Sequence, residues 1–291
     1  MKKYLGETSV LFAALLWGTI GFFTRNLSSL GFSSVGIVAV RSFFTALAMF
    51  IIIAVKDIKL LHISLKDIWM FLGTGIASFM FFNICYMSSI TENSLSVACI
   101  LMYTSPVWVS IISYFVFKEK FNKIKVLSLV ICLSGCVLTC MSSTLKLTKI
   151  GLIYGILSGI GYALYSIFGK IASKKYNSYT IVFYTFLFSF AALLPFCNAP
   201  GIIARVSSIK TFALLIGISI INTLLPYLLY TFGLSRIDAR KASVISIIEP
   251  VASAVTGLVF FGEVVGILGI IGIIFVIIGI YLLSFKSDNI T

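Results

Sequence analysis

Long apolar stretches separated by short polar segments make up almost the whole chain. A window of about 19 residues suits the detection of membrane helices, and it predicts ten spans, near residues 8–24, 34–55, 68–89, 94–117, 124–142, 150–171, 179–197, 209–233, 240–262 and 265–285. A helix rises about 1.5 Å per residue, so about 20 apolar residues cross a hydrocarbon core of about 30 Å. The pattern predicts an all-α membrane protein with ten transmembrane helices, surrounded by the lipid bilayer of the cell membrane.

The composition supports this prediction. Of the 291 residues, 60% are hydrophobic and only 11% are charged. A water-soluble fold cannot bury so much apolar surface. The N-terminal stretch has a basic start followed by apolar residues, as in a signal peptide, but no small-residue cleavage pattern follows. We therefore expect it to be retained as the first helix.

The net charge of +13 indicates orientation in the membrane. Lys and Arg lie in short segments between apolar spans and form no basic domain, so we expect no nucleic-acid partner. With a cytoplasmic N-terminus and ten spans, sixteen of the 22 cations fall on the cytoplasmic side, five fall outside, and Arg41 lies within a span. The positive-inside rule therefore predicts that both termini are cytoplasmic.

The six cysteines and the single histidine predict neither a cofactor nor a metal site. No C-x-x-C pair is present, and the cysteines lie in or beside apolar spans, where a thiol behaves as a small apolar side chain. Cys132, Cys136 and Cys140 share one helix face, and a thiolate site there is the weaker alternative.

The two halves of the chain resemble each other. "SPVWVSIISYFVFKE" (105–119) aligns with "EPVASAVTGLVFFGE" (249–263), with Pro106 over Pro250 and Glu119 over Glu263, both 144 residues apart. This offset predicts one transmembrane domain built from two repeats, 1–143 and 144–291. Each repeat holds five spans, an odd number, so the second must enter the membrane from the opposite side. Inverted repeats of this kind are typical of secondary transporters.

These motifs, together with "LLWG" in the first span and "GIVAVRSFFTALAMF" in the second, resemble those of the EamA-type transporters of the drug/metabolite transporter superfamily. The resemblance covers essentially the whole chain. It implies the ten-helix 5+5 fold of that superfamily, with a central cavity lined by the first, third, fourth, sixth, eighth and ninth helices. It also implies export or uptake of small metabolites, without fixing one substrate.

Glu249 is the strongest candidate for a functional residue. It lies about ten residues into its span, where a carboxylate costs a few kcal/mol unless it faces protein or water. Pro250 removes a backbone N–H beside it, which frees the carbonyl of Ser246 and favours a kink. Glu249 could bind a cationic substrate group or a proton, or it could be a packing group satisfied by a neighbouring helix.

The other candidate residues fall into two groups. Arg41 could bind a substrate carboxylate or pair with Glu249, or its long stem could reach the interface. We favour a structural role for it, because the resemblance implies that members of the family with different cargo carry this arginine. Glu119 and Glu263 end their spans and suit anchors or gates, and Pro106 and Pro250 suit structural or gating roles. The predicted substrate-binding residues are polar or aromatic groups on the expected cavity helices, namely Glu249, Asn83, Asn222, Tyr103, Trp17, Tyr162, Tyr227 and Ser105.

We therefore predict a secondary active transporter, with export the expected direction, for a small polar or amphipathic metabolite such as an amino acid or amine. Protons are the candidate coupling ion, and the protein is expected to be a monomer or a homodimer. No catalytic motif is present that would indicate an enzyme. The alternative is a flippase for a lipid-linked or amphipathic substrate, which requires a cavity open sideways to lipid. Phosphorylated cargo is disfavoured because no lysine is expected within a span.

Overall fold

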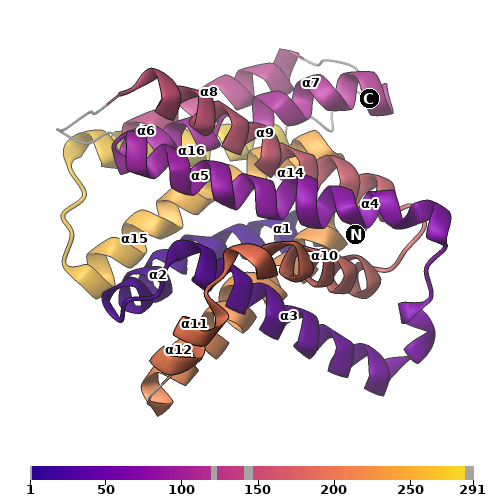
Figure 1. Cartoon of the computed structure of the whole chain (residues 1–291). Coiled ribbons are helices and arrows are strands. Elements are labelled where there is room, and N and C mark those ends of the chain that lie inside the picture. Colours follow the sequence, from indigo (N-terminus) through magenta and orange to yellow (C-terminus); the bar gives the residue numbers. More distant parts are fainter. Residues whose placement is uncertain (1, 119–122, 141–146, 207, 286–291) are drawn as a thin grey trace.

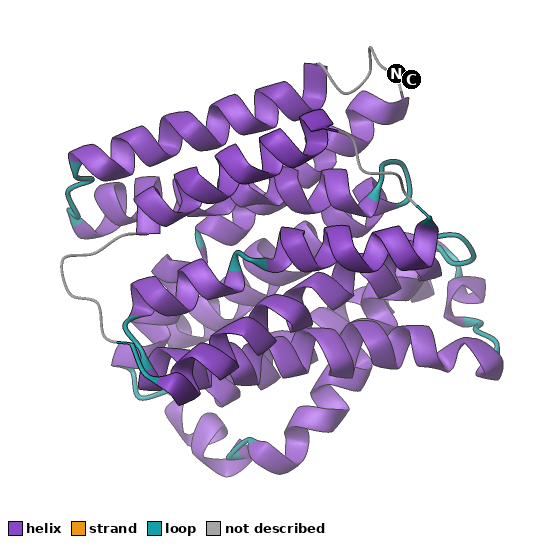
Figure 2. Ribbon diagram, turned by 90° about the horizontal axis from the view of Figure 1, so that it is seen from above, coloured by secondary structure: helices purple, strands orange, loops and turns teal. Residues whose placement is uncertain are grey.

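The structure is a computed structural model that describes residues 2–118, 123–140, 147–206 and 208–285. Within these ranges every regular element is a helix (Figures 1 and 2). The first half holds α1 (Lys2–Gly18), α2 (Ile20–Ser29), α3 (Ser34–Lys56), α4 (Ile68–Leu72), α5 (Phe81–Glu92), α6 (Leu95–Met102), α7 (Ser105–Phe117) and α8 (Lys123–Cys140). The second half holds α9 (Lys149–Ala172), α10 (Ser178–Leu193), α11 (Ala199–Arg205), α12 (Ile209–Ser219), α13 (Leu225–Leu234), α14 (Ala239–Ile245), α15 (Glu249–Phe261) and α16 (Ile267–Phe285).

Several helices join end to end into longer rods. In the described residues nine single or joined helices are long and apolar enough to span a membrane, and Ile267–Leu283 within α16 is a shorter apolar helix. An all-helical membrane fold is therefore confirmed, and ten crossings remain a prediction. Many large apolar side chains on the outer faces are exposed, as a lipid environment requires.

The predicted fourth and ninth spans are interrupted at equivalent places. α6 ends at Met102 and α7 starts at Ser105, while α14 and α15 are separated by the 3₁₀ turn η6 (Ser246–Ile248). Pro106 and Pro250 lie in the first turn of the helix that follows each break. A proline is tolerated there because that N–H has no helical acceptor. The sequence thus located both breaks, which take the form of a new helix start.

The third and eighth spans also match each other. Each contains a π-helical segment, η3 (Gly73–Met80) between α4 and α5 and η5 (Ile220–Leu224) between α12 and α13. Such segments widen the helix and leave carbonyl groups out of the regular ladder. Both therefore place irregular backbone in the middle of a span, where η3 packs on α9 and α10 and η5 packs on α3 and α1.

The helix contacts made by the first half match those made by the second half, with each helix replaced by its counterpart. α1 packs on α13 and α15, just as α9 packs on α5 and α7. α3 packs on its counterpart α10, and α8 packs on its counterpart α16. This arrangement places the starts of α8 and α14 at one end of the bundle, where Lys125 pairs with Asp238 at 3.3 Å. Arg25 and Glu263 pair at the other end.

The contact between α8 and α16 depends on glycine. A Cβ atom on Gly135 would lie 2.6 Å from the carbonyl oxygen of Gly272, so the two backbones touch directly. The hydroxyl of Ser128 donates to the carbonyl of Gly279 across the same interface at 2.6 Å. Small residues of this kind allow close helix packing in lipid, where no hydrophobic effect drives helices together.

We predict that Gly135→Ala destabilises the protein by about 1–3 kcal/mol, because the added methyl group must push α16 away. The measurement is the melting temperature of purified protein in detergent. Gly21→Ala is the control, since Gly21 lies in a helix with open space where its Cβ would be. Equal melting temperatures for the two variants would contradict the proposed backbone contact.

Candidate functional site

Glu249 lies inside the bundle, at the first residue of α15. Its side chain is partly buried, and the hydroxyl of Tyr162 on α9 donates to its Oε2 atom at 3.1 Å. Tyr103, at the break between α6 and α7, is buried as well. A Cβ on Gly18 would lie 2.8 Å from the carbonyl oxygen of Glu249, so α1 closes directly over the start of α15. The carboxylate thus faces protein rather than lipid.

An aromatic cluster adjoins Glu249. The ring of Trp17 lies 6.2 Å from that of Tyr162, 5.1 Å from Tyr227 and 5.3 Å from Tyr230, centre to centre. The tyrosine hydroxyls are held in place, since Tyr230 hydrogen-bonds to Ser166 at 2.7 Å. These residues leave a cavity of about 10 Å³, roughly what a single water molecule needs. The compartment is closed in this structure.

Arg41 is buried within the bundle, with 5% of its surface exposed, and does not reach the interface. Its guanidinium carbon lies 5.0 Å from the centre of the Phe79 ring. The Phe79 ring in turn lies 5.6 Å from the ring of Tyr227, centre to centre. Within the part of the chain that the structure describes, its Nε atom has no hydrogen-bond partner. A cation and a carboxylate therefore both adjoin the aromatic cluster, Arg41 through Phe79 and Glu249 through Tyr162, and part of the cation's hydrogen-bonding capacity is unused.

The two predicted amides make backbone contacts. Asn83 donates to the carbonyl of Phe79, one turn earlier in its own span, at 2.7 Å. Asn222 donates to the carbonyl of Leu16 at 2.5 Å and to the hydroxyl of Thr19 at 2.8 Å, which fastens η5 to the junction of α1 and α2. Its Oδ1 atom has no partner in the described residues. Asn222 holds the helix that carries Trp17.

The structure brings some candidates together and separates others. Trp17, Tyr162 and Tyr227 line one small cavity, and Glu249 adjoins it through its hydrogen bond to Tyr162. Ser105 is buried at the start of α7, beside Pro106. Glu263 lies at the end of the bundle, where about half of its side chain is exposed and pairs with Arg25. Glu119 lies outside the described residues.

The sequence profile of the EamA-like transporter family matches residues 4–141 and 149–285. The chain belongs to the EamA-like transporter family. It is 30% identical to an uncharacterized transporter of Archaeoglobus fulgidus over 89% of this chain and 88% of the relative. It is 27% identical to the uncharacterized transporter YxxF of Bacillus subtilis over 90% of this chain and 83% of that protein. A crystal structure that is 16% identical superposes with a TM-score of 0.81 over 98% of each chain, which shows a shared fold.

Membership of the EamA-like family supports a role as a multi-pass membrane transporter. The uncharacterized inner membrane transporter YicL of Salmonella typhimurium, 25% identical over 88% of this chain and 87% of its own, is similar along nearly the same length. The resemblance inferred from the motifs is thereby confirmed.

The sequence of this EamA-like chain did not indicate the partners of three charged side chains. Lys241 in the first turn of α14 pairs with Glu7 of α1 at 2.6 Å, with 4% and 10% of the two side chains exposed. On α9, Lys170 donates to the carbonyls of Leu234 and Ile237, at 2.6 and 2.8 Å, and so caps the end of α13. Both lysines belong to apolar spans, so the expectation that no lysine would lie within a span was wrong. The available signal was the position of Glu7 and Lys241 at the edges of their predicted spans.

We predict that Lys241→Met destabilises this EamA-like protein by about 3–5 kcal/mol, because it leaves the Glu7 carboxylate buried and unpaired. Glu7→Gln combined with Lys241→Met should recover part of the loss, since no uncompensated charge remains. Melting temperatures in detergent measure both effects.

The exposed ion pair between Arg25 and Glu263 provides the matched control for the Lys241→Met variant. Arg25→Met should cost at most about 1 kcal/mol, because about half of each partner is exposed to solvent. A Lys241→Met protein as stable as the Arg25→Met protein would show that the buried pair contributes little.

Proposed function

We propose that this EamA-like protein is a secondary active transporter that exports a small polar metabolite, such as an amino acid or amine, by alternating access. The observation that carries the proposal is that Glu249 and Arg41, of opposite charge, adjoin one aromatic cluster inside the bundle, Glu249 through Tyr162 and Arg41 through Phe79 and Tyr227. Intramembrane ionisable groups that face the interior of a bundle commonly mark substrate and ion pathways.

The chemistry of the compartment suits a zwitterion. The carboxylate of Glu249 can accept hydrogen bonds from a substrate ammonium group, and Trp17 and the tyrosine rings offer faces that attract cations. The unused donor capacity of Arg41 suits a substrate carboxylate, which guanidinium groups bind in a bidentate manner. We therefore extend the structural role favoured for Arg41 from the sequence to direct contact with the substrate.

Proton coupling follows from the same carboxyl group. A buried Glu249 can hold either a proton or the ammonium group of the substrate, and only one at a time. Exchange of the two across the membrane would link export to the proton gradient. The counterpart of Glu249 in the first repeat is Ser105, which carries no carboxylate. Proton binding would therefore involve only the second repeat.

Three observations support the two inverted repeats, 1–143 and 144–291, that alternating access requires. The family profile matches the chain twice, and equivalent helices of the two halves make equivalent contacts. The helix breaks before Pro106 and Pro250 also lie at equivalent positions. The repeats imply ten crossings with both termini in the cytoplasm. Opening then requires the Arg25–Glu263 contact to separate at one end and the Glu7–Lys241 contact at the other.

The flippase alternative receives less support from this compartment. A lipid-linked substrate needs a transport site that is open sideways to acyl chains, whereas the cavity beside Glu249 is about 10 Å³ and enclosed by aromatic side chains. The proposal concerns one protomer, which can act alone or within a homodimer.

The decisive experiment is flux in proteoliposomes. A thermal-shift panel of amino acids, amines, sugars and nucleotides first identifies a ligand of the wild-type protein, and its flux is then measured with and without a pH gradient. We predict that Glu249→Gln keeps normal insertion and melting behaviour but lowers gradient-driven flux at least tenfold, because the proton-binding group is gone.

The matched control is Glu92→Gln, which removes one carboxylate from the end of α5 and should leave flux unchanged. Wild-type flux in Glu249→Gln would exclude Glu249 from the transport step. Flux that is lost in Glu249→Gln but never depended on the pH gradient would retain the substrate role and exclude proton coupling.

A further inference from the structure

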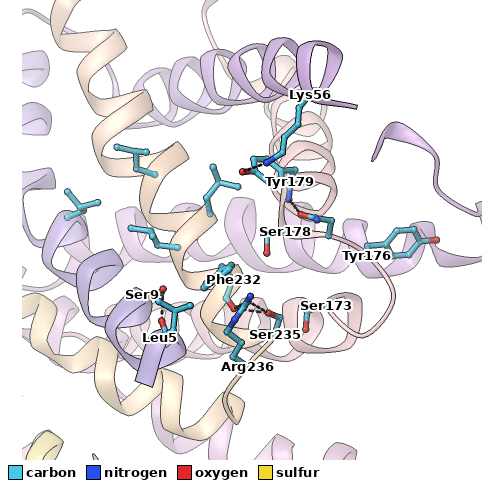
Figure 3. Close-up of a pocket in the computed structure, with 15 residues that line it drawn as sticks. Leu5, Ser9, Lys56, Ser173, Tyr176, Ser178, Tyr179, Phe232, Ser235 and Arg236 are labelled. Atoms are coloured by element: carbon cyan, nitrogen blue, oxygen red, sulfur yellow. Dashed lines mark hydrogen bonds between the residues drawn. The ribbon is translucent and has the colours of Figure 1, made fainter. Parts of the chain in front are cut away.

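A second and much larger cavity lies away from the Glu249 compartment. It is a groove of about 820 Å³ between α1 and α13 on one side and the end of α3 and the start of α10 on the other (Figure 3). Leu5, near the start of α1, lines it, so the groove opens at the end of the bundle where the chain begins. The positive-inside count predicts that this end is cytoplasmic.

The groove is apolar in its depth and polar at its mouth. Leu16, Leu228 and Leu229 line the inner part, and Leu5 and Leu225 continue it to the exposed surface of the transmembrane helices. Helix surfaces of this kind face acyl chains in a membrane protein. The groove is therefore accessible to an apolar chain that enters sideways from the bilayer.

Two cations flank the mouth from different walls. Figure 3 shows Lys56, at the end of α3, on one wall, and Arg236, just after α13, on the other. No acidic residue is among the described residues that line the groove. The nearby carboxylate of Asp67 is already bound by Lys175 and by the hydroxyl of Tyr176. The mouth thus carries a net positive charge.

Both cations keep hydrogen-bond donors available. The Nζ atom of Lys56 donates to the hydroxyl of Tyr179 at 3.0 Å, which uses one of its three N–H groups. Arg236 lies against the ring of Phe232, and its Nη1 atom donates to the carbonyl of Phe232 and the hydroxyl of Ser235. The contacts fix the two side chains while the remaining N–H groups can bind an anion.

We propose that this groove binds one anionic membrane lipid. Its phosphate headgroup lies between Lys56 and Arg236, and an acyl chain runs inward along Leu228 and Leu229 toward Leu16. The charge of the mouth selects an anionic headgroup over a zwitterionic one. The groove shares no lining residue with the small cavity beside Glu249, so the lipid holds α1 and α13 against α3 and α10 without entering that cavity.

The test uses the full chain in detergent with phosphatidylglycerol or phosphatidylcholine, and native mass spectrometry counts retained lipid. We expect one tightly retained phosphatidylglycerol molecule and no retained phosphatidylcholine. The double variant Lys56→Gln, Arg236→Gln should reduce phosphatidylglycerol retention about thirtyfold, the change expected when two cations next to an anionic surface are lost.

Two further variants distinguish binding in the groove from nonspecific electrostatic attraction of the lipid to the protein. Lys59→Gln combined with Lys66→Gln removes two exposed cations that follow α3, and it should leave retention unchanged. Leu228→Trp keeps every charge but narrows the inner part of the groove, and it should lower retention while the protein keeps its melting temperature without lipid.

Three results would overturn the proposal. Equal loss in the two double variants would show that net charge alone attracts the lipid. Unchanged retention in Leu228→Trp would place the acyl chain elsewhere. Displacement of the lipid by millimolar glycerol phosphate would show that the groove recognises a soluble phosphate rather than a lipid.

Discussion

Lipid cannot solvate a charge or an unpaired backbone group, and this constraint determines where every ionisable side chain of the bundle lies. Glu249 and Arg41 are tolerated because aromatic rings, hydroxyls and each other's field replace water around them. Glu7 and Lys241 are tolerated because they form a direct ion pair between α1 and α14. Each buried charge therefore ties together helices that would otherwise meet only through weak packing.

The same constraint explains the irregular backbone. Helix breaks at η6 and before Ser105, and the π-helical segments η3 and η5, release carbonyl groups that lipid could not satisfy. All four occur in spans that pack around the central compartment. Irregular backbone in the middle of a membrane is tolerated only where protein or a water-filled cavity covers it, so its position marks the region where a polar substrate can be accommodated.

Much of this arrangement could be predicted from residue patterns alone. Apolar run length located the spans, prolines 106 and 250 located two breaks, and the isolated carboxylate identified Glu249. The partners of the polar groups could not be predicted, because they depend on how distant helices meet. Nothing near Asn222 in the chain indicates that it binds the backbone at Leu16, and Glu7 and Lys241 lie more than two hundred residues apart. Lys241 was misjudged because a cation at the edge of a span usually faces water.

An ion pair stabilises each end of the bundle, and the two pairs differ in how far they are exposed to solvent. Glu263 and Arg25 are each about half exposed, whereas Lys241 and Glu7 are almost fully enclosed. Dissolved ions screen accessible charges far more than enclosed ones. Ionic strength would therefore loosen the contact between α2 and α15 while leaving the contact between α1 and α14 intact, so the two ends of the bundle would respond differently to the salinity of the surrounding medium.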